Sequence, residues 1–152
     1  MRSDKIQIAV IGASDCDETI WNQAKEIGRA IARAGAVLVC GGMSGVMEAS
    51  ARGAKDEGGR TLGILPGPSR DTANDAIDIA VATGLGHFRN FVIAQTADVF
   101  IAVAGRYGTL SEIAMALTLG KTVVGLGTWE IEGVVSALDP EDAVKKALES
   151  VR

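Results

Sequence analysis

Two kinds of hydrophobic pattern alternate along the chain and predict strands and helices in turn. Short runs of apolar, mostly β-branched residues are typical of buried strands. Between them, apolar residues recur every three or four positions, and Ile20, Ala24, Ile27 and Ile31 lie on one face of an amphipathic helix. The predicted strands are residues 6–11, 37–40, 61–65, 77–81, 99–103 and 122–126. The predicted helices are residues 18–34, 44–57, 88–97, 109–119 and a last one that begins at Asp139 with Pro140 in its first turn.

This order of elements predicts an α/β fold built on a parallel sheet. Strands that are apolar on both faces need cover on both sides, which the intervening helices supply. We expect a single Rossmann-like domain over residues 1–152, with an open sheet of about six or seven strands and helices on both faces. The length suits one domain, and neither a linker nor a repeat interrupts it. In such sheets, ligands bind beyond the carboxyl ends of the strands.

Composition and charge exclude several classes of function. The chain is 47% hydrophobic, which is too apolar for a disordered protein. It has no apolar run near the ~20 residues that a membrane helix needs, so we expect no membrane span. Fifteen Lys and Arg against 19 Asp and Glu give a net charge of −4, which does not favour nucleic acid as a partner.

The cysteines, the histidine and the N-terminal residues bear on metal binding and location. Cys16 and Cys40 lack metal-ligand spacing, and His87 is the one histidine, so we expect no metal site. We expect His87 to be a loop residue. Residues 1–5 run directly into the first predicted strand without a signal peptide, from which we expect a cytoplasmic protein.

Glycine is the unusual feature of the composition, with 19 residues in 152 against a typical frequency of ~7%. Glycine allows a positive φ and a close approach of ligand to backbone, and the helix that follows such a turn presents free N–H groups to an anion. Neither the GxGxxG fingerprint nor a P-loop is present. We therefore predict a phosphate-bearing ligand held by three turns that follow strands at one sheet edge: Gly12-Ala13-Ser14, Gly41-Gly42-Met43-Ser44-Gly45 and Gly105-Arg106-Tyr107-Gly108-Thr109.

These motifs resemble a known family. The run from Gly41 to Met47 resembles the GGxxGxM segment of the Lonely Guy family, the cytokinin-activating phosphoribohydrolases. Arg89-Asn90 resembles the family's Arg-Lys pair, and residues 104–112 resemble its PGGxGTxxE motif. The similarity covers most of the chain and is greatest to a short branch that includes the molybdenum cofactor carrier proteins.

The resemblance implies a role for each motif residue. The enzymes of the family cleave the N-glycosidic bond of a nucleoside 5′-monophosphate, which requires an anion beside the ribosyl cation, assistance to the departing base and a fixed phosphate. By resemblance, Glu112 is the carboxylate and Arg89 the cation that assists the base. The backbone of Gly105, Gly108 and Thr109, with the Thr109 hydroxyl, holds the phosphate.

Three departures from the family pattern leave two main functions open, beside a weaker third one, a purely structural oligomer with a vestigial pocket. The family's lysine is Asn90 here, its second motif glycine is Arg106, and its proline is Ala104. The anion-binding turns are therefore retained better than the catalytic set. We expect a binding or carrier protein for a nucleotide or a molybdenum cofactor-type pterin, and the alternative is an active nucleoside monophosphate phosphoribohydrolase. A lysine decarboxylase is rejected because no lysine lies near the glycine turns to form a Schiff base, except Lys121 beyond the helix that follows the third turn.

Several of these residues also have a plain structural interpretation. Thr109 and Glu112 have the spacing of a capping box, in which the threonine caps the helix and the glutamate reaches back to it. Ser44 can cap the second helix. Arg89 and Arg106 can be surface cations that face solvent.

The helices predicted at residues 88–97 and 109–119 are apolar nearly all round. Such a helix must be buried on more than its sheet side, and in a short chain a second copy supplies the cover. We therefore expect a homodimer or homotetramer formed through these two helices. Trp21 and Trp129 are interpreted as packing residues rather than as platforms for a base.

Overall fold

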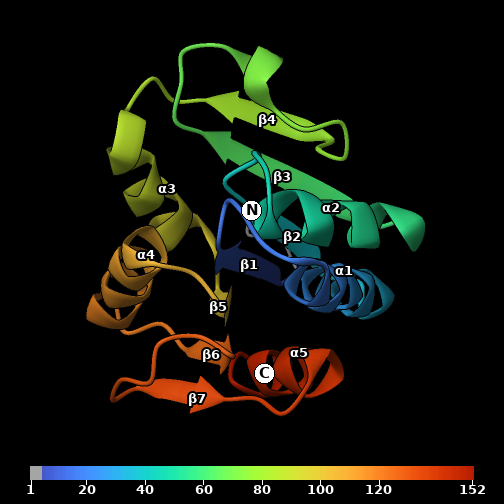
Figure 1. The fold of residues 1–152 in the computed structure, drawn as a ribbon, viewed down its shortest axis with the longest axis vertical. Helices are drawn as coiled ribbons and strands as arrows, with labels where there is room; N and C mark the ends of the chain where they lie inside the picture. The colour runs from blue at the N-terminus through green and yellow to red at the C-terminus, as the bar shows by residue number, and fades with distance from the viewer. Residues whose placement is uncertain (1–4) are drawn as a thin grey trace.

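The computed structural model describes residues 5–152, which form seven strands and five α-helices (Figure 1). Residues 1–4, on which the expectation of a cytoplasmic protein partly depends, lie outside the described residues. In chain order the elements are β1 Gln7–Gly12, α1 Glu18–Arg33, β2 Val37–Cys40, α2 Val46–Asp56, β3 Arg60–Leu65, β4 Ile79–Ala82, α3 Arg89–Thr96, β5 Val99–Val103, α4 Tyr107–Thr118, β6 Val123–Leu126, β7 Val134–Ser136 and α5 Pro140–Glu149, with short 3-10 helices at Arg70–Thr72 and Gly86–Phe88.

The seven strands form one parallel sheet in the order β4-β3-β2-β1-β5-β6-β7. The chain builds outward from β1 to β4, returns to place β5 beside β1, and then builds outward on the other side. The strand order therefore reverses between β1 and β5, where Ile8 is paired with Val99. The predicted α/β class with an open parallel sheet is confirmed, and this reversal is the place where such folds bind ligands.

Alternate residues of the central strands enter two separate hydrophobic layers. Ile8 and Val10 of β1 pack with residues of α1, α2 and α5. Ala9 and Ile11, which point to the opposite face, pack with residues of α3 and α4. Figure 1 shows these two groups of helices on opposite sides of the sheet. None of the helices in residues 5–152 is long and apolar enough to cross a membrane.

Two glycines let the backbones of α1 and α2 come into contact. A Cβ atom placed on Gly28 would lie 1.9 Å from the carbonyl oxygen of Ser50. A Cβ atom on Gly53 would lie 1.9 Å from the carbonyl oxygen of Lys25. The helices therefore pack more closely than any side chain at these two positions would allow.

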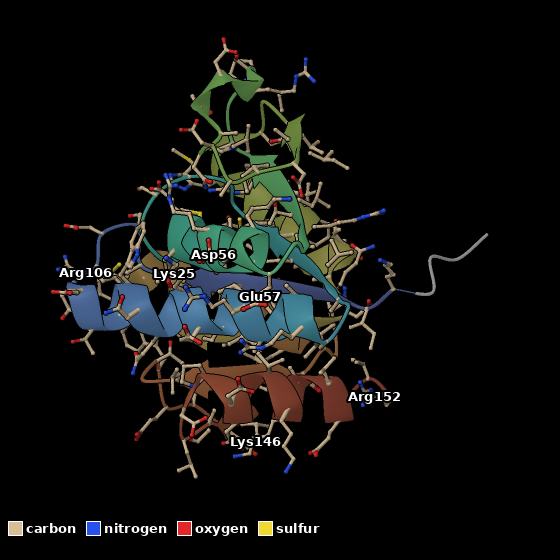
Figure 2. All side chains as sticks on the ribbon, turned by 90° about the vertical axis from the view of Figure 1, so that its right-hand side faces the viewer. Lys25, Asp56, Glu57, Arg106, Lys146 and Arg152 are labelled. Atoms are coloured by element: carbon tan, nitrogen blue, oxygen red, sulfur yellow. The ribbon has the colours of Figure 1, made fainter. Side chains whose placement is uncertain are left out.

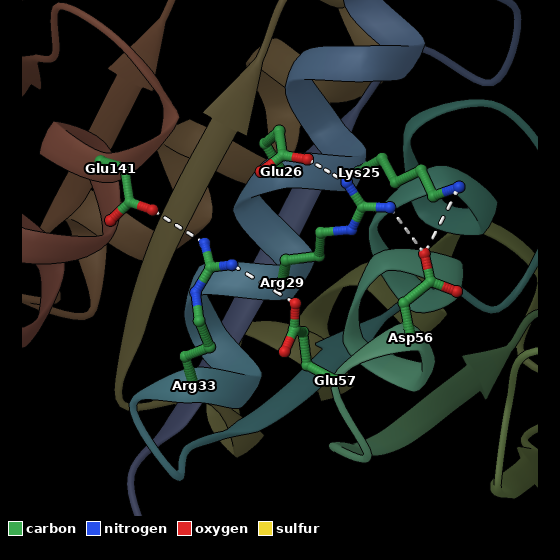
Figure 3. Close-up of polar contacts among 7 residues, drawn as sticks. All are labelled: Lys25, Glu26, Arg29, Arg33, Asp56, Glu57 and Glu141. Carbon is green, nitrogen blue, oxygen red and sulfur yellow. Dashed lines mark hydrogen bonds and ion pairs between the residues drawn. The ribbon is translucent and has the colours of Figure 1, made fainter.

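Ion pairs join the outer faces of α1, α2 and α5 (Figure 3). Arg33 of α1 lies 3.4 Å from the Glu57 carboxylate and 2.8 Å from that of Glu141. Arg29 lies 3.0 Å from Asp56. Figure 2 shows this face of the molecule, with Asp56 and Glu57 beside α1. Because these side chains are largely exposed to solvent, each pair contributes little to stability.

Three sequence predictions need correction. The strand predicted at residues 77–81 is β4 and begins at Ile79, because Asp78 is bound to the backbone N–H and the hydroxyl of Thr61. The short strand β7 was not predicted, since its three residues are mostly exposed and end in a serine. The helix predicted at residues 109–119 begins at Tyr107, which moves Thr109 inside it.

Candidate functional site

The cavity that gathers the predicted site residues, called the main cavity below, lies where the strand order reverses, beyond the carboxyl ends of β1 and β5, and has a volume of about 380 Å³. It gathers residues from separate parts of the chain. Eleven of the predicted site residues line it: Gly12, Ala13, Ser14, Gly41, Met47, Arg89, Asn90, Arg106, Gly108, Thr109 and Glu112. Five other predicted residues lie outside this lining: Gly42, Ser44, Gly45, Gly105 and Tyr107.

The N-terminus of α4 opens into this cavity. Arg106 occupies the N-cap position, and in the described chain its side chain makes no capping hydrogen bond. The Leu110 N–H donates to the Arg106 carbonyl at 3.0 Å across this end of the helix. The N–H groups of Gly108 and Thr109 belong to the first turn, where helical partners are lacking, and both residues line the cavity. This end of α4 therefore has the geometry and the dipole to accept an anion.

The backbone at this turn depends on glycine. Gly105 has a φ of 94°, and a Cβ atom there would lie 2.2 Å from the Thr109 hydroxyl oxygen. Gly105 thus packs directly against Thr109, which is buried. At Gly108, by contrast, an added Cβ would meet no other described residue within 4 Å, apart from its chain neighbours and the nearby backbone of α4 itself, so this position is open.

The capping box predicted for Thr109 and Glu112 is wrong. Because α4 begins two residues earlier, the N-cap is Arg106 and not Thr109. Glu112 therefore lies in the second turn of the helix, where its side chain extends into the cavity. Thr109 and Glu112 have the spacing of a capping box, but the helix begins at Tyr107, directly after the turn that contains Gly105.

The second glycine turn, residues 41–45, is hydrogen-bonded to the backbone of the first, residues 12–14. The Val46 N–H donates to the Ala13 carbonyl at 2.9 Å, and the Ser44 hydroxyl donates to the Ser14 carbonyl at 2.9 Å. A Cβ atom on Gly45 would lie 2.3 Å from the Ala13 carbonyl oxygen. Ser44 does not cap α2, whose N-cap is Gly45. The N-terminus of α2 is therefore directed at protein backbone, and only Gly41 and Met47 of this segment reach the cavity.

Arg89 is held at the first residue of α3 by the backbone of two strand ends. Its Nη1 donates to the carbonyl oxygens of Gly41 and Ile64, both at 2.7 Å, and its Nε donates to the Asn90 side chain at 3.0 Å. The side chain is half-buried, and this burial lowers its pKa while Glu112 opposes the change. Arg89 is thus a fixed cation in the cavity wall and not a free surface charge.

Glu112 faces the cavity as a carboxyl group without a hydrogen-bond partner among residues 5–152. Burial raises its pKa from the ordinary 4.5 to about 7, although the nearby Arg89 acts in the opposite direction. A group with this pKa exchanges its proton close to neutral pH. Its position allows it either to donate a hydrogen bond to a ligand or to stabilise a positive charge.

Five residues of the cavity lining were not predicted from the sequence. Val10, Ile11 and Ile93 form apolar wall, whereas His87 and Asp15 are exposed polar residues. His87 was expected in a loop and lies in the 3-10 helix Gly86–Phe88 at the mouth. Arg106 lies on the same end of the molecule as the start of α1 (Figure 2). Within residues 5–152, no three His, Cys, Asp or Glu residues are arranged to hold a metal ion.

Comparison with known proteins gives concordant matches. A family model described as SLOG cluster4 family matches residues 5–150. An "Uncharacterized protein" of Archaeoglobus fulgidus is 48% identical over 146 residues, which cover 95% of this chain and 96% of that protein. A probable cytokinin riboside 5′-monophosphate phosphoribohydrolase of Oryza sativa is 33% identical over 98 residues, 62% of this chain; the chain covers only 40% of the rice protein.

Two solved structures extend the comparison over nearly the whole chain. The molybdenum cofactor binding protein of Rippkaea orientalis superposes with a TM-score of 0.93 at 35% identity, covering 99% of this chain and 100% of that protein. The molybdenum cofactor carrier protein of Chlamydomonas reinhardtii superposes with a TM-score of 0.87 at 37% identity, covering 95% of this chain and 98% of that one.

Proposed function

Because the chain belongs to the SLOG cluster4 family and presents an open helix N-terminus in its main cavity, we propose that it binds and carries a phosphorylated small molecule. The observation that supports this most strongly is the first turn of α4. There Gly108 and Thr109, whose N–H groups lie in the first helical turn, line a cavity whose wall also contains the fixed guanidinium of Arg89. An anionic phosphate meets both the helix dipole and a cation at this place.

The rest of the cavity fits a flat organic ring. Ile11 and Ile93 are buried residues of its wall, and Met47 adds a flexible thioether. A volume of about 380 Å³ accommodates a small ligand of this kind. The ligand classes that combine one ring system with a phosphate, and that the relatives handle, are nucleotides and molybdenum cofactor-type pterins. We propose one of these as the cargo.

The departures at Asn90 and Arg106 favour carriage over catalysis. Asn90 lacks the charge of the lysine found in the similar enzymes, and its side-chain oxygen accepts a hydrogen bond from Arg89. Arg89 in turn donates from Nη1 to two backbone carbonyls. The cation expected to assist a departing base is therefore engaged in holding strand ends, and the proton donor that a lysine offers is missing.

A phosphoribohydrolase is the second candidate, favoured by Glu112. This carboxyl group lines the same cavity as Arg89 and has a pKa of about 7, so both protonation states are available near neutral pH. In such a reaction, the ionised carboxylate stabilises the ribosyl cation or orients the attacking water.

One experiment separates the two functions. The protein is incubated with AMP and with base-modified nucleoside monophosphates, while free base and bound ligand are both measured. A carrier gives a binding isotherm that requires the phosphate and releases no base. Base release that Glu112→Ala abolishes would instead establish the enzyme.

We also propose that the protein forms a homo-oligomer through the α3–α4 face. Large apolar side chains on or beside these helices are exposed, among them Phe88 at 77%, Phe91 at 49% and Leu119 at 37%. Figure 1 shows α3 and α4 side by side on the sheet face opposite α1, α2 and α5. A second copy that buries this face would remove these side chains from water.

A further inference from the structure

We propose that the loop between β6 and β7, through Thr128 and Trp129, holds the turn at residues 104–107 in the conformation that presents the α4 N–H groups to an anion. This inference builds on the proposed function, because it assigns positioning residues to the same phosphate site. Neither Thr128 nor Trp129 lines the main cavity, so neither is expected to touch the ligand.

The turn before α4 has a backbone that needs support. Ala104 has a φ of 48°, and it is the only non-glycine residue with a positive φ in the described chain. L-residues avoid this left-handed region because the Cβ atom crowds the backbone. Gly105 follows with a φ of 94°. A glycine adopts a positive φ without strain, but a residue such as Ala104 persists in this region only where neighbouring groups fix it, and such places are often binding sites.

The loop after β6 supplies two hydrogen bonds to this turn. The Thr128 hydroxyl donates to the Ala104 carbonyl at 2.6 Å, and the Trp129 Nε1–H donates to the Arg106 carbonyl at 3.0 Å. These hydrogen bonds fix the carbonyl groups of the two residues that flank Gly105. The turn is also anchored to the sheet, since the Ala104 N–H donates to the Leu126 carbonyl at 3.2 Å.

The aromatic rings add a second contact between the two segments. The Trp129 ring lies 5.9 Å from the ring of Tyr107, the first residue of α4, with an angle of 31° between the ring planes. Tyr107 is 79% exposed, and the ring of Trp129 lies against it on the side of the β6–β7 loop. The Arg106 carbonyl thus accepts both the helical Leu110 N–H and the indole N–H, which sets the direction in which α4 begins.

The consequence is that the amides of Gly108 and Thr109 are aimed before any ligand arrives. A turn free to move would have to be ordered on binding, and affinity would fall by the cost of that ordering. Thr128 and Trp129 are therefore expected to affect the affinity for phosphate compounds without contacting them.

The test uses two variants that each remove one donor and keep the shape of the side chain. Thr128→Val removes the hydroxyl, and Trp129→Phe removes the indole N–H while retaining an aromatic ring. Thr118→Val and Trp21→Phe are matched controls, since Thr118 donates to the Ala114 carbonyl within α4 and Trp21 lies in α1. The affinity for ribose 5-phosphate is measured by calorimetry. Hydrogen–deuterium exchange of residues 104–109 is measured without ligand.

We expect Thr128→Val and Trp129→Phe to lower the affinity about fivefold to tenfold each, as the loss of one hydrogen bond implies. Exchange at residues 104–109 should rise in both, while both controls stay within about twofold of the wild type. Unchanged affinity and exchange in the two test variants would overturn the inference, even if the wild type binds ribose 5-phosphate. If the wild type does not bind it, the proposed phosphate site fails, and the exchange measurement still decides whether the loop holds the turn.

Discussion

The guanidinium of Arg89 donates a hydrogen bond of 2.7 Å to the carbonyl oxygen of Gly41, the residue directly after β2. A Cβ atom on Gly41 would lie 2.7 Å from the same Nη1 atom, so glycine is needed for this approach. The bond, together with that to Ile64, fixes a positive charge in the cavity wall at the ends of two strands. The charge of Arg89 lowers the pKa of Glu112, but the burial of Glu112 raises it by more, so the pKa remains above its ordinary value.

The first prediction concerns the effect of pH on stability through Glu112. The folded protein keeps the Glu112 proton up to about pH 7, whereas the unfolded chain releases it near 4.5. Between these values the folded state binds more protons, so the free energy of unfolding falls as pH rises. Glu112→Gln has no such loss and should be more stable than wild type at pH 8, on the order of 2 kcal/mol, with little difference below pH 4.5.

Denaturant unfolding at several pH values measures this difference. Glu130→Gln is the control, because Glu130 is an exposed carboxylate in the β6–β7 loop. If Glu112→Gln raised the free energy of unfolding equally at pH 4 and pH 8, the gain would not come from the raised pKa of Glu112 in the folded state.

The second prediction concerns Gly108→Val. The position is open in the described structure, so the fold should tolerate the side chain, but its methyl groups would enter the cavity beside the α4 amides. We expect ribose 5-phosphate to bind at least tenfold more weakly, with the unfolding temperature little changed. Gly67→Val provides the control, since Gly67 also has open space and lies outside the cavity lining. Equal binding by both variants would place the phosphate elsewhere.

The third prediction concerns the contact between α1 and α2. Alanine usually stabilises a helix by ~1 kcal/mol relative to glycine. At Gly28, however, the new methyl group would overlap the Ser50 carbonyl, and we expect a net loss of about 1–3 kcal/mol in the free energy of unfolding. Gly108→Ala, in the open first turn of α4, should keep or slightly raise stability. A stabilised Gly28→Ala variant would show that the helices are not in backbone contact.

The fourth prediction concerns assembly. Replacing Phe88 and Phe91 together by serine should shift the protein toward monomer in sedimentation at micromolar concentration, because the proposed interface loses its largest apolar side chains. Leu138→Ser is the control, since Leu138 is 87% exposed but lies before α5, on another part of the molecule. A wild-type protein that is monomeric at this concentration would contradict the proposed oligomer.

Much of the fold could be predicted from local sequence pattern. The strands at residues 37–40 and 99–103 match β2 and β5 in full, because apolar runs closed by glycine leave little freedom in their bounds. The motif similarity to the Lonely Guy family and the molybdenum cofactor carriers is confirmed by the family match and the solved structures. Three residues of the α4 motif, Arg106, Gly108 and Glu112, line one cavity in the structure, and their roles there stay predictions.

Features that depend on sheet order and long-range contacts could not be predicted this way. Nothing local indicates that the Ala13 carbonyl closes the N-terminus of α2, since the two segments meet only through the pairing of β1 with β2. The same holds for Ile93, which α3 brings to the cavity, and for Trp129, whose indole N–H reaches a turn 23 residues earlier. The interpretation of Trp129 as a packing residue missed this hydrogen bond because a sequence shows no partner for it.

A crystal structure of the protein with AMP bound tests the central claim most directly. The account predicts a phosphate group with oxygens about 2.7–3.2 Å from the backbone nitrogens of Gly108 and Thr109, and the nucleotide's ring directed toward Ile93. A phosphate held away from these amides, for example by the Arg106 side chain alone at the rim, would contradict it.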